Sequence, residues 1–140
     1  MFQIDMSVLV GMILSQDPEV SLKVREHWPL HAALRELHEC LQADPDLSDR
    51  WNAARLPQLC MTPDSEVGMR TSGVTVALWR LAERGVLILS EESGVARFKP
   101  SPDQHALGRR HLMRLGPVVA RAVQRTGQRL AAALTASSKY

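Results

Sequence analysis

The 140-residue chain has little cysteine, few aromatic residues and no long apolar run. Its two cysteines, Cys40 and Cys60, are too few for a disulfide framework and fit a reducing compartment. The apolar run Met6–Leu14 falls well short of the ~20 residues that span a bilayer. We therefore expect a cytoplasmic protein with no membrane partner, in which this run forms a buried first helix.

Residues with catalytic or metal-binding spacing are also lacking. The sequence has no phosphate-cradling glycine loop, nucleophile elbow or dinucleotide fingerprint. His27 and His31 have a ligand-like spacing, but Pro29 lies between them, and Cys40 and Cys60 lack the paired spacing of zinc ligands. We expect no enzymatic activity, no metal and no cofactor.

Acidic residues are scarce at one end of the chain. Residues 101–140 hold seven basic residues and one acid, a balance of +6, whereas residues 1–66 hold five basic and eleven acidic residues, a balance of −6. The whole chain carries a net charge of only +2. The asymmetry indicates a polyanion or an acidic protein as partner, or contact between the two poles within one chain or across a dimer.

The residues that are present indicate a single, mostly α-helical domain over 1–140, with its N-terminal helices within 3–60. Asp17 caps and Pro18 opens one expected helix. The expected helices here are 17–27, 29–42 and a third that Ser48 caps and that carries Trp51. A turn is predicted at 62–66.

The segment 71–99 contains the signals for a helix, a glycine and two strands. Thr71 or Ser72 is the expected cap of a helix whose apolar residues share one side. Gly85 marks the point where the chain leaves that helix in a left-handed conformation. A strand buried on both faces is predicted at 86–89, a turn at 90–94 and a second strand at 95–99.

This order, carried by T71-S-G-V-T-V-A-L-W-R-L-A-E-R-G-V-L87, resembles the winged helix-turn-helix superfamily over residues 65–100. Bacterial regulators of the MarR, PadR and GntR groups have a recognition helix that ends in a similar phrase and is followed by a wing. The resemblance implies a winged-helix core at about 30–100, with a two-stranded β-hairpin wing and additional N- and C-terminal helices. The helix before the recognition helix is then 48–60, or the motif is degenerate.

The resemblance also implies a transcriptional regulator that binds double-stranded DNA as a homodimer. The implied DNA-binding residues are Arg70, Thr71, Ser72, Thr75, Arg80, Arg97 and Lys99. Winged helices also dock proteins, so an adaptor whose basic C-terminal helix binds an acidic partner is the alternative. Arg97 and Lys99 equally fit a solvated strand face, and Trp79 fits a core or an interface better than base stacking.

Residues 103–136 form a basic amphipathic helical segment, which Gly116-Pro117 interrupts. Its apolar side, expected in the core or in a dimer interface, holds Leu112, Leu115, Val119, Ala122, Val123, Thr126 and Leu130. The opposite side collects Arg110, Arg114, Arg121 and Arg125 if the helix continues through the proline. These arginines can bind phosphates or an acidic partner, or form the solvated back of a packed helix.

Overall fold

The computed structural model describes residues 4–64 and 68–136. The elements assigned in these residues are α1 (Met6–Leu14), β1 (Leu22–Lys23), α2 (Trp28–Ala43), α3 (Pro45–Ala53), β2 (Met61–Asp64), β3 (Gly68–Thr71), α4 (Val74–Glu83), β4 (Leu87–Glu92), β5 (Val95–Pro100), α5 (Pro102–Met113) and α6 (Pro117–Ala136). The expectation of a mostly α-helical fold is confirmed.

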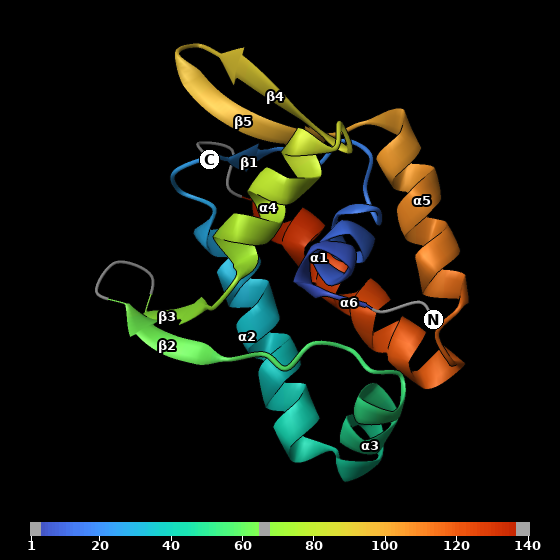
Figure 1. Cartoon of the computed structure of the whole chain (residues 1–140). Helices are drawn as coiled ribbons and strands as arrows, with labels where there is room; N and C mark the ends of the chain where they lie inside the picture. Colours follow the sequence, from blue (N-terminus) through green and yellow to red (C-terminus); the bar gives the residue numbers. More distant parts are fainter. Residues whose placement is uncertain (1–3, 65–67, 137–140) are drawn as a thin grey trace.

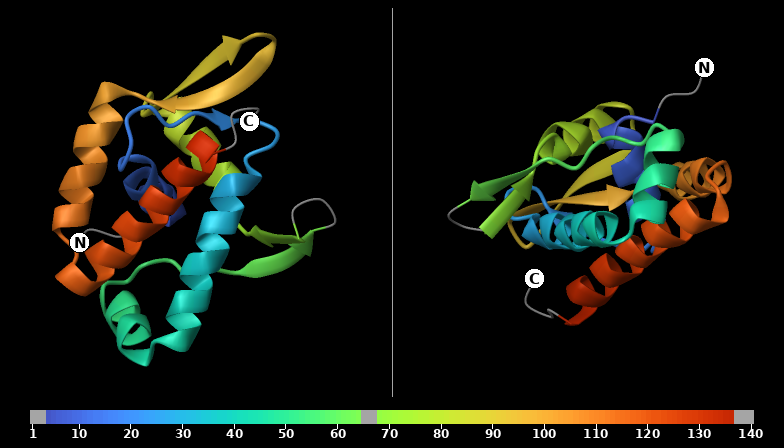
Figure 2. Two further views of the ribbon diagram at one scale, coloured as in Figure 1. Left: turned by 180° about the vertical axis from the view of Figure 1, so that it is seen from behind. Right: turned by 90° about the horizontal axis from the view of Figure 1, so that it is seen from below.

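Helix α1 is the central element, and α4, α5 and α6 pack around it (Figures 1 and 2). The helix begins at Asp5, whose carboxylate accepts the Val8 backbone N–H at 3.0 Å. Every residue from Leu9 to Leu14 is buried, in agreement with the buried first helix that the sequence predicts. Helix α6 approaches closely because Gly127 has no side chain: a Cβ there would lie 2.6 Å from the Ile13 carbonyl oxygen.

A three-stranded antiparallel sheet in the order β1-β5-β4 lies beside α4. Strands β4 and β5 form the hairpin expected for 86–99, with a turn at Ser93 (φ 53°) and Gly94 (φ 79°). Gly85 has a φ of 74°, and the Val86 N–H donates to the Leu81 carbonyl at 2.9 Å, which closes the end of α4. The predicted order of helix, left-handed glycine and hairpin is confirmed.

The helix predicted at 17–27 is wrong. The Asp17 carboxylate accepts the Glu19 N–H at 2.9 Å, and the Val20 N–H donates to the Asp17 carbonyl, which forms a turn. The chain then becomes extended, and Leu22 pairs with Phe98 where β1 joins β5. Asp-Pro is a turn signal as well as a helix start, and the distant pairing with β5 selects the turn here.

Two predicted N-caps are also wrong. Asp44, not Ser48, caps α3 by accepting a backbone N–H of the first turn at 3.2 Å. The N-cap of α4 is Gly73, which has a φ of 86° and no side chain to bond, so neither Thr71 nor Ser72 caps that helix. Asp44 followed by Pro45 is itself a preferred helix start, whereas Gly73 starts α4 without a side-chain cap.

The chain between α3 and α4 differs from the expected helix at 48–60 and turn at 62–66. Helix α3 ends at Ala53, and a second antiparallel hairpin, β2–β3, follows it. Thr62 lies in β2, while Ser65 and Glu66 of the predicted turn lie outside the described residues. This hairpin, rather than a helix, immediately precedes α4.

The burial predicted for the strand at 86–89 is wrong in part. Leu87 is buried, but Ile88 is 49% exposed and Leu89 is 52% exposed. Strand β4 is at the edge of the sheet, and the apolar run does not distinguish a strand covered on both faces from an exposed edge.

Helices α5 and α6 are separate, because the chain turns at residues 114–116, before Pro117 opens α6 (Figure 1). The expected apolar side is buried at Leu112, Leu115, Val119, Val123, Thr126 and Leu130. Helix α6 packs against α1, α2 and α3 within the same chain. These buried residues are therefore core, and a dimer interface has to use another surface.

Candidate functional site

Helix α4 has one face in the core and one face on the surface. Val74, Ala77, Leu78 and Leu81 are buried against the core, as their spacing predicts. The outward face carries Thr75, Val76, Trp79, Arg80 and Glu83, all of them exposed. The β2–β3 and β4–β5 hairpins extend from the same side of the molecule, and α4 lies between them (Figures 1 and 2).

Two buried histidines hold the beginning of α4 in place. His27 lies just before α2, and His31 lies near the start of α2. His27 Nδ1 donates to the Val24 carbonyl at 3.0 Å, so its Nε2 accepts from the Thr75 hydroxyl at 3.2 Å. His31 Nδ1 accepts the Thr71 backbone N–H at 3.0 Å. Burial, together with the nearby Arg70 charge, lowers the pKa of His27 below its usual 6.5. The two histidines, whose spacing resembles that of metal ligands, thus serve to position the start of α4.

The predicted DNA-binding residue Thr71 is buried, with an exposed fraction of 1%. Its hydroxyl lies 3.4 Å from the Met61 sulfur across the β2–β3 hairpin, and its N–H is held by His31. A side chain in this position cannot reach a ligand on the surface, so Thr71 is a packing residue. Nothing in the sequence indicates this burial, because it depends on the pairing of β3 with β2.

Trp79 joins α4 to the β4–β5 hairpin. Its ring contacts Phe98 edge-to-face with centroids 5.1 Å apart, yet it is still 42% exposed. Leu89 pairs with Phe98 across the hairpin, so it lies on the same face of the sheet. Val76 is 56% exposed one helical turn before Trp79. The outward face of α4 is therefore partly apolar.

The predicted cationic residues do not all share one face. Arg70 is in β3, shortly before α4, and Arg80 is on the outward face of α4; both are exposed. Arg97 and Lys99 alternate with Phe98 along β5, so they point to the opposite face of the sheet from α4. Lys99 is also paired with Glu92, and the hydrogen bond from its ammonium group lowers the pKa of that carboxyl group. The structure thus places Arg97 and Lys99 of the β4–β5 hairpin apart from Arg70 and Arg80.

The four arginines predicted as one basic face are all exposed, but they belong to two helical segments. Arg110 is in α5 and Arg114 caps its end, whereas Arg121 and Arg125 are in α6, which begins after Gly116. A continuous stripe of arginines requires an unbroken helix, so these four residues do not form one. Each pair can still contribute to the positive potential of its own helix surface.

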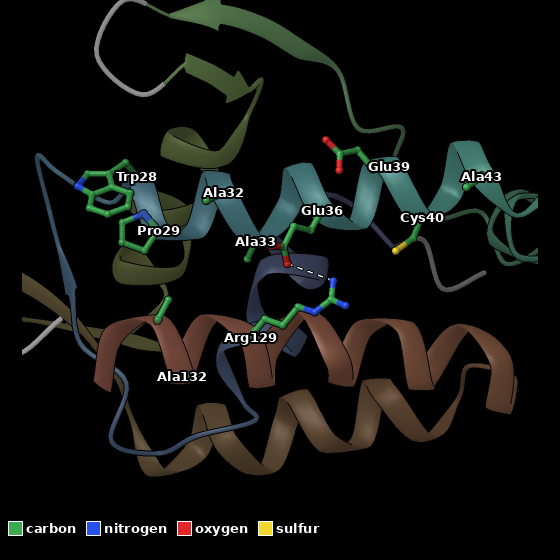
Figure 3. A pocket seen from close by; sticks show the side chains of 11 residues that line it. Trp28, Pro29, Ala32, Ala33, Glu36, Glu39, Cys40, Ala43, Arg129 and Ala132 are labelled. Carbon is green, nitrogen blue, oxygen red and sulfur yellow. Dashed lines mark hydrogen bonds and ion pairs between the residues drawn. The ribbon is translucent and has the colours of Figure 1, made fainter. Parts of the chain in front are cut away.

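A surface groove of about 680 Å³ separates α2 from the C-terminal half of α6 (Figure 3). Small side chains line much of it, namely Ala32, Ala33, Ala43, Ala132 and Ala133. Glu36 and Arg129 form an ion pair across it, with 3.1 Å between Oε2 and Nη1. Trp28 stands at one end and is 47% exposed. The sequence showed these alanines, but not that two distant helices would bring them together.

The part of the chain that the structure describes contains no group of three or more metal-ligating side chains. Cys40 lies in the groove and Cys60 is exposed just before β2, and both are free thiols. No helix in the described ranges combines the length and the hydropathy that crossing a bilayer requires. Comparisons with protein-family models, with curated proteins and with solved structures give no match.

Proposed function

We propose that this chain is a winged-helix protein that binds double-stranded DNA through the outward face of α4, and that it acts as a homodimeric transcriptional regulator. The observation that carries the proposal is the position of α4, exposed along one side between two projecting hairpins (Figure 1). The order of α4, Gly85 and the β4–β5 hairpin is similar to that of a recognition helix followed by a wing. A helix is about 10–12 Å wide with its side chains, and the major groove is about 12 Å wide.

The side chains proposed to contact DNA lie on α4, on the segment just before it and on β5, and they make two kinds of contact. Arg70 and Arg80 are the residues proposed to bind phosphates, which position a protein on the duplex. Ser72 is exposed, and its hydroxyl can bond to base edges, whereas the Thr75 hydroxyl already donates to His27 and can only accept from a base. Arg97 and Lys99 can reach only phosphates beside the hairpin, because they face away from α4. Phosphate contacts therefore supply most of the affinity in this proposal.

The test is a fluorescence-anisotropy titration with a mixed-sequence duplex across a salt series. Wild type is expected to bind, with log K falling linearly in log salt, and the Arg70→Gln/Arg80→Gln variant is expected to reduce that slope by roughly two units. The matched control is Arg35→Gln/Arg50→Gln, which removes two exposed charges from α2 and α3. Equal loss in both variants, or no binding at 50 mM salt or below, overturns the assignment to α4.

The second candidate is an adaptor that docks a protein. The apolar side chains Val76, Trp79 and Leu89, which are about half exposed on the same side, favour it, since such patches mark protein interfaces more often than DNA interfaces. The basic C-terminal helix is the proposed contact for an acidic partner. An adaptor is expected to ignore duplex DNA at moderate salt and to retain a stoichiometric partner, which Trp79→Asp releases while Met113→Asp, at another exposed apolar site, does not.

A further inference from the structure

The outward face of α6 is basic. Val119, Val123 and Leu130 point into the core, and the residues on the opposite side of the helix are exposed, namely Arg121, Gln124, Arg125 and Gln128. The helix carries no acidic residue. Arg109 of α5 lines a pocket of about 180 Å³ together with Gln124, and so extends this face. The α6 basic surface, as we call it, consists of Arg109 and these four residues of α6.

The arginines of the α6 basic surface have no ionic partner within the described parts of the chain. Arg109, Arg121 and Arg125 form no ion pair with any residue in 4–64 or 68–136. Three of the four acids on α2 and α3 are already in ion pairs, Glu36 with Arg129, Glu39 with Arg35 and Asp46 with Arg50. Contact between the acidic and basic poles of one chain therefore does not neutralise this surface, which is left to attract an anion from outside.

The side chains of this surface favour a phosphate backbone over an acidic protein or a membrane. Guanidinium groups bind phosphate oxygens through two parallel hydrogen bonds, and the amides of Gln124 and Gln128 can donate to them as well. Protein interfaces have an apolar core, and a helix that lies on a membrane buries an apolar face. Here α6 exposes no large apolar side chain in its described residues, and Met113 of α5 at the border is too small for such a patch.

We propose that the α6 basic surface binds the phosphate backbone of a second DNA duplex, so that one molecule joins two DNA segments. The inference rests on the proposed function for the first duplex, which α4 contacts. Helices α4 and α6 both pack on α1 and lie on opposite sides of it (Figure 2). Duplex DNA is stiff, with a persistence length of about 150 bp, so one short segment does not bend around the molecule to reach both helices. Because the contacts at α6 go to phosphates, the second duplex is bound without regard to sequence.

The α6 basic surface is tested by itself in the Arg70→Gln/Arg80→Gln variant, whose contacts at α4 are weakened. In fluorescence anisotropy, the full chain with these changes is expected to retain salt-dependent binding to a mixed-sequence duplex. Adding Arg121→Gln/Arg125→Gln is expected to reduce the slope of log K against log salt by roughly two units, because two phosphate contacts are lost.

The matched control adds Arg35→Gln/Arg50→Gln to the same background. It removes two exposed arginines that are already paired with acids, and it is expected to leave the slope unchanged. An equal change of slope with the control and with the α6 changes overturns the proposal. Displacement of the duplex by polyglutamate as readily as by unlabelled DNA would assign the surface to an acidic protein, and also overturns it.

The joining of two duplexes is measured by the capture of a labelled duplex on beads that carry an unlabelled one. Wild type is expected to capture the label, and Arg121→Gln/Arg125→Gln is expected to lose this capture while it still binds a single duplex through α4. Capture that survives these changes overturns the proposal, because a homodimer that uses its two α4 helices alone would behave in this way. Failure of the α4 assignment is read separately, since Arg70→Gln/Arg80→Gln would then bind a single duplex like wild type.

Discussion

The rings of His27 and His31 stack with their centroids 5.1 Å apart and their planes inclined by 30°. Both rings are buried: His27 bonds to the Thr75 hydroxyl in the first turn of α4, and His31 bonds to the Thr71 N–H at the end of β3, just before α4. The Arg70 charge lies near enough to oppose a proton on His27. The beginning of α4 therefore depends on two buried imidazoles: the Thr71 N–H requires an unprotonated Nδ1 on His31, and burial favours the neutral form of His27.

This dependence predicts that the protein loses stability in mild acid. Burial lowers the folded-state pKa of His27 below 6.5, so the unfolded chain binds the proton more tightly. The stabilisation is complete above about pH 6.5 and is lost as the pH falls through the lowered value. Urea unfolding from pH 8 to pH 5 is expected to show the decline, and His27→Gln is expected to reduce it.

The control for this experiment is His111→Gln, because burial and the Arg114 and Arg110 charges lower the pKa of His111 in the same direction. That ring is only partly buried on α5 and is distant in sequence from α4. A decline of the same size in wild type and His27→Gln would show that the histidine pair does not set the acid response.

The second prediction contrasts two tryptophans. Trp51 is fully buried and its Nε1–H donates to the Pro57 carbonyl at 3.0 Å, so Trp51→Ala is expected to cost roughly 3–5 kcal/mol in unfolding free energy. Trp79 has only one edge against Phe98, a contact worth about 0.5–1.5 kcal/mol beyond the buried area. Denaturant unfolding of the two alanine variants checks the difference. Equal losses would mean that Trp79 is much more buried in solution than in this structure.

The sequence predicted the elements that depend on local signals. The period of the apolar residues located α2, α4 and the buried side of 103–136, and Gly85 located the end of α4. The alternation of β5 and its glycine-containing turn located the hairpin. These signals are complete within a few residues, so no distant contact was needed to read them.

Distant contacts decided what the sequence could not show. Residues 17–27 became a turn and a strand because Leu22 pairs with Phe98. Thr71 is buried because His31 binds its N–H and because β3 pairs with β2. The α2–α6 groove exists only because α2 and α6, which are far apart in the sequence, pack together. Propensity is a weak guide wherever tertiary pairing competes with it.

The third prediction concerns the contact between α6 and α1. A Cβ at Gly127 would lie 2.3 Å from Gln16 Cγ and 2.6 Å from the Ile13 carbonyl oxygen, so α6 has to move away from α1. Gly127→Ala adds about 0.5–1 kcal/mol in helix propensity, but overpacking costs typically 1–3 kcal/mol. A net loss in thermal unfolding is expected. Gly116→Ala, where nothing lies within 4 Å, is the control and is expected to stay within about 0.5 kcal/mol of wild type.

The last prediction concerns the junction between α4 and the hairpin. Gly85 has a φ of 74° and no atom within 4 Å of an added Cβ, so any effect of a substitution comes from the backbone alone. Gly85→Ala is expected to cost about 1–2 kcal/mol, because an L-residue with a Cβ is strained in the left-handed region. Gly85→Asn is expected to cost less, because asparagine tolerates that region better. Equilibrium unfolding of both variants gives the order. If alanine were as stable as asparagine, the left-handed conformation at residue 85 would not be what turns the chain from α4 into β4.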